Sequence, residues 1–186
     1  MRQNKSPVHL ANGPATGIGF GTLIIGFLIY DMLWKSPLAK NEKVGTAVSF
    51  VLLVVATFGM SQVMNGRAVF IHVGALMGTI MAANVWMRIW PSQRKIIAGI
   101  KGTGPAADPS VAALAGLRSK HNTYMSIPLL FFMISFHYPA LPIGGFDFSY
   151  GNREFGWAVA SIMVLLGWGI ARYLYGKSAS EAPNSF

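Results

Sequence analysis

The sequence contains no cysteine among its 186 residues. This absence excludes disulfide bridges, thiolate metal sites, cysteine-ligated iron–sulfur clusters and covalent attachment of a c-type haem within the chain. Charged residues are also scarce, at 11% of the chain, whereas hydrophobic residues make up 53%. Because cysteine is absent, any metal or haem held here must use histidine, methionine, carboxylate or tyrosine ligands. The composition is too apolar for an ordinary soluble domain.

Apolar stretches long enough to cross a bilayer, which takes about 20 residues in a helix, recur along the chain. The sequence therefore predicts an all-α integral membrane helical bundle with about five transmembrane helices. The expected helices cover residues 16–34, 46–63, 68–90, 120–138 and 155–175. Together they form a membrane domain over residues 16–175, with an outer segment at 1–15 and a disordered tail at 176–186. The basic start has no adjacent apolar core with a cleavage site, so we expect no removable signal peptide.

Residues 91–119 separate the third and fourth expected helices. They contain a basic stretch, SQRKIIAGIK, and a loop with two prolines, GTGPAADPS. We expect one or two short interfacial helices on the cytoplasmic surface, with arginine and lysine at the headgroups. Ile96, Ile97 and Ile100 would then face the acyl boundary. A disordered loop is the alternative.

Basic residues outnumber acidic ones by 15 to 6, which gives a formal net charge of +9. Most of them fall on one side of the expected bundle, so the positive-inside rule places the N-terminus outside and the C-terminus in the cytoplasm. The cytoplasmic set is Lys35, Lys40, Lys43, Arg88, Arg94, Lys95, Lys101, Arg118, Lys120, Arg172 and Lys177. The outer set is Arg2, Lys5, Arg67 and Arg153. The charge is thus mainly a topology signal, which favours membrane lipid as a partner and argues against nucleic acid.

Two histidines are expected at similar depth in the outer half of the membrane. The third helix runs inward from His72, and the fourth runs outward toward His137. Such a pair could ligate a b-type haem or another histidine-bound metal. Alternatively, each imidazole hydrogen-bonds a carbonyl or interfacial water. His121 lies about 24 Å from His137 along one helix, so these two cannot share a metal.

Polar residues also converge at the cytoplasmic ends of the helices. Cationic, amide and hydroxyl groups there could hold a planar or anionic small molecule, or simply anchor the chain to lipid phosphate. His121 is also suited to a proton relay. We take the following as candidate catalytic residues: Asp31, Asn84, Arg88, His121, Asn122 and Tyr124.

Three segments carry a family resemblance: YDMLWKSPL (30–38), GRAVFIHVGALMGTIMAANVWMRIWPSQRKIIAGIK (66–101) and RSKHNTYMSIPLLFFMISFHYP (118–139). They resemble the membrane domain of the bacterial membrane-bound, cytochrome c-linked urate oxidase (urate hydroxylase) family. The resemblance implies a multi-helix domain of the bacterial inner (cytoplasmic) membrane that hydroxylates urate. Full-length members have further helices before the matched part and pass electrons to a fused C-terminal cytochrome c domain. We therefore expect a truncated version that lacks the cytochrome c domain.

Two functions follow from this resemblance. The first is an integral membrane subunit of a larger redox or energy-converting complex, packed against other integral membrane subunits. The second is the catalytic membrane component of a urate oxidase-type enzyme that passes electrons to a separate cytochrome c. Kinship of fold does not decide between them, because function depends on the site rather than the scaffold.

Overall fold

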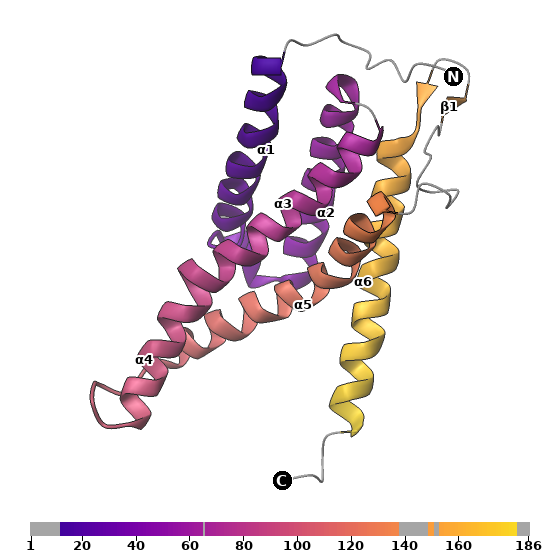
Figure 1. Cartoon of the computed structure of the whole chain (residues 1–186). Coiled ribbons are helices and arrows are strands. Elements are labelled where there is room, and N and C mark those ends of the chain that lie inside the picture. The colour runs from indigo at the N-terminus through magenta and orange to yellow at the C-terminus, as the bar shows by residue number, and fades with distance from the viewer. Residues whose placement is uncertain (1–11, 65, 138–148, 151–152, 182–186) are drawn as a thin grey trace.

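The computed structural model describes residues 12–64, 66–137, 149–150 and 153–181 (Figure 1). It is built of helices, apart from one short antiparallel pair of strands. The elements are α1 (Asn12–Leu33), the 3-10 helix η1 (Pro37–Lys40), α2 (Glu42–Val63), α3 (Gly66–Asn84), the π-helical turn η2 (Val85–Ile89), α4 (Trp90–Ile100), α5 (Pro109–His137), β1 (Ser149–Tyr150), β2 (Arg153–Glu154) and α6 (Gly156–Glu181). The predicted all-helical class is confirmed.

Among the residues that the structure describes, four helical stretches are long and apolar enough to cross a membrane. They are Gly13–Leu33, Glu42–Val63, Ala68–Ile100 and Gly156–Ser178. The fourth expected span falls in α5, which is not among them. Its N-terminal half carries charged and amide side chains that pack inside the bundle, and such groups lower the hydropathy of a helix. The predicted orientation across the membrane stays a prediction.

The third expected helix does not end near Trp90. It continues through η2 and α4 as one 33-residue helical stretch, Ala68–Ile100. At about 1.5 Å per residue this rod is about 50 Å long, well beyond the roughly 30 Å of hydrocarbon in a bilayer. Pro91 is accommodated because η2 precedes it, with the Trp90 amide bonded to the Val85 carbonyl across the wider turn. An α-turn there would press the proline ring against the carbonyl four residues earlier.

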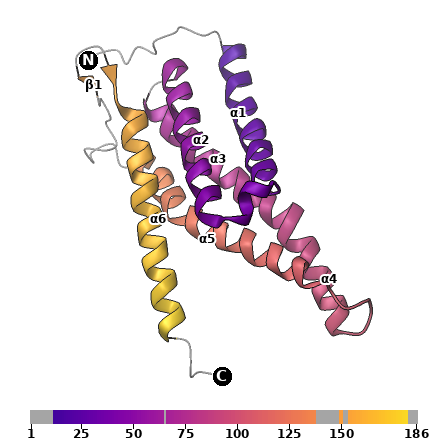
Figure 2. The same ribbon diagram turned by 180° about the vertical axis from the view of Figure 1, so that it is seen from behind.

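The helix pair α4–α5 forms an arm that leaves the bundle obliquely (Figures 1 and 2). Gly102, with a φ of 69°, makes the turn that sends the chain back, a conformation that glycine adopts without strain. Asp108 caps the start of α5 by accepting a hydrogen bond of 2.8 Å from the Ser110 amide. Its interactions with the side chain and then the backbone of Ser110 lower the pKa of its carboxyl. The segment predicted as interfacial, 91–119, is therefore largely helical, with its second helix continuous with the bundle.

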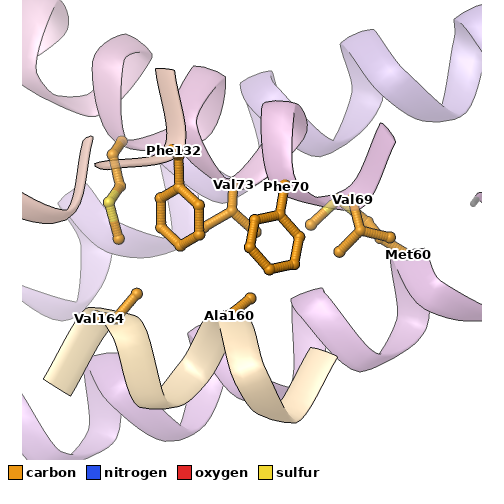
Figure 3. Close-up of a cluster of buried hydrophobic side chains, with 8 residues drawn as sticks. Met60, Val69, Phe70, Val73, Phe132, Ala160 and Val164 are labelled. Atoms are coloured by element: carbon orange, nitrogen blue, oxygen red, sulfur yellow. The ribbon is translucent and has the colours of Figure 1, made fainter. Parts of the chain in front are cut away.

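The largest apolar core lies where α2, α3, α5 and α6 meet (Figure 3). Val73 and Phe132 are fully buried, and the Phe132 ring meets Phe70 edge-on with 5.4 Å between centroids. Helix α6 packs closely on α5, since a Cβ added at Gly167 would lie 2.7 Å from Pro128 Cδ. Pro128 thus serves as a packing surface within α5.

Two predicted boundaries differ from the structure at the ends of the chain. Helix α1 already begins at Asn12, inside the segment expected to precede the bundle. Helix α6 continues to Glu181, so residues 176–181 are helical where a disordered tail was expected. Helix α1 accommodates Pro14 because it falls in the first turn, where no intrahelical donor is needed, and α6 meets no proline before Glu181. The rest of both predicted segments lies outside the described residues.

Candidate functional site

A buried carboxylate binds several cations at one end of the region where α3 packs against α1 and α5. Asp31, near the C-terminus of α1, is 6% exposed. Its Oδ1 accepts hydrogen bonds from Arg88 Nε at 2.9 Å and Arg118 Nη2 at 3.0 Å. Its Oδ2 lies 2.7 Å from Lys35 Nζ. Three cations from the end of α1, from η2 and from α5 therefore converge on one negative charge.

Arg118 is the most deeply buried charge, with none of its surface exposed. Besides Asp31 it reaches Asn84 Oδ1, 3.4 Å from Nη1. Its guanidinium carbon lies 5.0 Å from the centroid of the Tyr30 ring, within cation–π range. Its Nε has no hydrogen-bond partner among the described residues. A buried guanidinium is stable only with such partners, so Arg118 depends on its neighbours from α1 and α3.

Two amides connect this charge cluster to the rest of α5. Asn84 is fully buried at the end of α3. Its Nδ2 donates to Tyr30 Oη and to Asn122 Oδ1, each at 3.0 Å. Asn122 Nδ2 in turn donates to the Met81 carbonyl at 3.1 Å. Both amides are thus held in one orientation by partners on other helices.

The hydrogen bonds then lead to an imidazole. Tyr30 Oη lies 2.7 Å from His121 Nδ1. The Tyr30 hydroxyl accepts from Asn84 and can at the same time donate to Nδ1 of an imidazole that carries its proton on Nε2. The Trp34 ring packs on the imidazole with 4.0 Å between centroids, and its Nε1 donates to Ser49 Oγ at 3.1 Å. Asn84, Tyr30 and His121 are thus joined by consecutive hydrogen bonds.

We call this group the polar cluster. Its members come from α1, α3, η2 and α5, and they are Tyr30, Asp31, Asn84, Arg88, Arg118, His121 and Asn122. The structure brings together all the predicted catalytic candidates except Tyr124. That side chain turns toward α6, where its ring centroid lies 6.3 Å from that of Tyr175.

Two members of the polar cluster, Tyr30 and Arg118, were missing from the sequence-based set. A signal for Arg118 was present, since it precedes His121 by three residues and so shares its helix face. Tyr30 adjoins Asp31, and only the packing of α1 and α5 against α3 makes its hydroxyl meet His121. No sequence spacing within α1 indicates that contact.

The histidines expected in the outer half are arranged differently from the expected shared site. His72 Nδ1 bonds the Ala68 carbonyl at 2.9 Å, and its Nε2 lies against α1, 2.8 Å from a Cβ built on Gly19. The face of α3 that meets α5 is a different one, marked by Gly74, whose built Cβ lies 3.1 Å from Phe132 Cβ. His137 is exposed at the end of α5.

The two histidines are directed at different surroundings. His72 Nδ1 bonds the Ala68 carbonyl and its Nε2 lies beside Gly19 of α1, whereas His137 lies exposed at the end of α5. Within the described ranges, no group of three or more histidine, cysteine, aspartate or glutamate side chains gathers as a metal site. Ligation by these two histidines stays an untested prediction.

Residues 3–185 match a family described as urate oxidase N-terminal. The chain belongs to this family. No curated protein and no solved structure matches it significantly. The expected resemblance to a urate oxidase-like domain is thereby confirmed. The apolar helices suit a membrane-embedded protein, whereas a link to cytochrome c and a truncation stay predictions.

Proposed function

We propose that this urate oxidase-like chain is an integral membrane subunit of a larger redox complex. The observation that carries the proposal is the pairing within the polar cluster. Asp31 is surrounded by cations of this same chain, and Asn84 and Asn122 are fully engaged by neighbouring helices. Polar groups whose ion pairs and hydrogen bonds are formed within the chain fix the helices relative to one another, which is a structural role.

The surface of the spanning helices supports the same proposal. Only 22% of the best apolar window in α1, and the same share in α2, is buried inside the chain. Most of this surface is therefore available to membrane lipid or to helices of other integral membrane subunits. A subunit of an assembly uses such surface for packing.

A second candidate is the catalytic membrane component of a urate oxidase-type enzyme that passes electrons to a separate cytochrome c. The Tyr30–His121 pair favours it. Oxidation of urate releases protons together with electrons, and a neutral imidazole can accept a proton at its unprotonated nitrogen. Since Nδ1 faces the Tyr30 hydroxyl, His121 would act as the base through Tyr30, whose hydroxyl would pass its own proton to Nδ1 and take up one from the substrate.

Purification of the full chain from its own membranes in a mild detergent separates the two candidates. The measurements are the set of co-purifying subunits, the oxidised and reduced visible spectra, and urate-dependent reduction of cytochrome c. Tyr30→Phe removes the hydroxyl next to His121, and Tyr173→Phe is the matched control because Tyr173 is 67% exposed.

A stoichiometric complex whose urate-dependent activity is unchanged by Tyr30→Phe supports the subunit role. Loss of that activity in Tyr30→Phe, with normal assembly and with Tyr173→Phe unaffected, supports the catalytic role. A chain that purifies alone and neither reduces cytochrome c nor shows a chromophore contradicts both candidates.

A further inference from the structure

One face of α4 is exposed and has a repeating composition. Trp90, Arg94, Ile97 and Lys101 follow one another at spacings of four, three and four residues, which places them on one side of a helix. Trp90 is 51% exposed and Ile97 is 49% exposed. Ile100, three residues after Ile97, completes this row and is 81% exposed. Two cations therefore alternate with large apolar side chains on a surface that no described residue covers.

The opposite side of α4 packs against the part of the chain that follows it. Ser92 is buried, and a Cβ built on Gly99 would lie 3.0 Å from the Pro105 carbonyl oxygen. The return of the chain into α5 thus fixes which face of α4 is turned outward. The packing of α4 against the following chain, and not the helix alone, therefore determines that this row is the exposed one.

Charge along the arm is almost entirely positive. Residues 85–101 contain four basic side chains and no acidic one. Of the four, Arg88 is used by Asp31 inside the polar cluster. The one acidic residue between 85 and 120 is Asp108, which is engaged at the start of α5. A partner for the exposed row must therefore offer negative charge next to apolar material.

We propose that this row, Trp90, Arg94, Ile97, Ile100 and Lys101, docks the α4–α5 arm onto the anionic headgroup layer of the membrane. Arg94 and Lys101 contact lipid phosphates, while the indole and the two isoleucines enter the acyl boundary. Tryptophan is favoured at that depth. The membrane is within reach because α4 continues the membrane-spanning helix without a break, as one helical stretch from Ala68 to Ile100 (Figures 1 and 2).

The absence of cysteine makes a direct test practical, since a single introduced cysteine accepts a spin label. Ile100→Cys places the label in the row. Lys95→Cys places it about 140° around the helix from Trp90 and serves as the control. The full chain is placed in nanodiscs of phosphatidylcholine alone or of equimolar phosphatidylcholine and phosphatidylglycerol. The accessibility of each label to oxygen and to a water-soluble nickel complex reports whether it lies in lipid or in water.

In the anionic nanodiscs, the Ile100→Cys label is expected to favour oxygen and the Lys95→Cys label to favour the nickel complex. The double charge reversal Arg94→Glu/Lys101→Glu should lower the equilibrium constant for docking of the arm, as reported by the Ile100→Cys label, by roughly tenfold or more. Lys40→Glu/Lys43→Glu changes the same number of exposed charges outside the arm and should leave it unchanged.

The proposal is overturned if the Ile100→Cys label stays in water in both lipids, or if the two double reversals act equally. It is also overturned if the label becomes immobile only with a co-purifying subunit and stays inaccessible to oxygen, since a protein then covers the row. Should the glutamate variant fail to insert, Arg94→Gln/Lys101→Gln tests the same charges. Docking concerns the arm alone, so its failure leaves the proposed subunit role standing.

Discussion

Asp31→Asn is expected to destabilise the bundle by about 3–5 kcal/mol, because it leaves a buried cation without its counter-charge. Most of this cost comes from Arg118, which is 0% exposed and has Asp31 as its ion-pair partner. Arg88, with 23% of its side chain exposed, can turn partly to water. Lys35, with 54% exposed, regains hydration almost fully and adds little.

The free energy of unfolding is measured in mixed micelles titrated with a denaturing detergent, followed by tryptophan fluorescence. Lys35→Gln is the control and should cost no more than about 1 kcal/mol, as expected of an exposed ion pair. Arg118→Leu should cost less than Asp31→Asn, because the carboxylate keeps Arg88 and Lys35. A loss below about 1 kcal/mol for Asp31→Asn would falsify the dependence of Arg118 on this carboxylate.

Two further substitutions probe the bundle away from this charge. Tyr30→Phe removes the bond to His121 and should cost about 1 kcal/mol in the same titration; an unchanged midpoint would contradict the hydrogen bond. Gly167→Ala should destabilise the α5–α6 contact by about 1–3 kcal/mol, since the new methyl meets Pro128 at 2.7 Å. Gly169→Ala, with nothing within 4 Å, should be neutral or stabilising, and equal effects of the two alanines would refute this packing.

The helices themselves could be predicted because their apolar runs match the thickness of a bilayer. The exception is informative. Pro91 was read as the end of the third helix, since proline normally interrupts the preceding turn. The structure retains the helix by widening that turn at Val85–Ile89. A π-turn leaves little trace in a pattern of apolar residues, so the boundary could not be placed from the sequence.

The polar cluster could be predicted in part, because ionisable residues near helix ends in an apolar chain stand out. Asp31, Arg88 and His121 were found in this way. The contacts between them depend on the packing of α1 against α3 and α5, which spacing within one helix does not define. The same limit explains His72, whose depth was predicted while the direction of its ring toward Gly19 was not.

The π-turn at Val85–Ile89 makes the length of this segment as important as its side chains. Such a turn accommodates one extra residue, so a deletion of one residue there would restore α-helical geometry and leave everything beyond it facing the same way. Closing the turn to α-helical geometry without a deletion would instead rotate α4 by about 100° about the helix axis, so that Ser92 and Gly99 turn away from the returning chain. Relatives with a single-residue gap in this segment are therefore expected to present the same face of α4, whereas relatives that keep its length without the π-turn would present a different one.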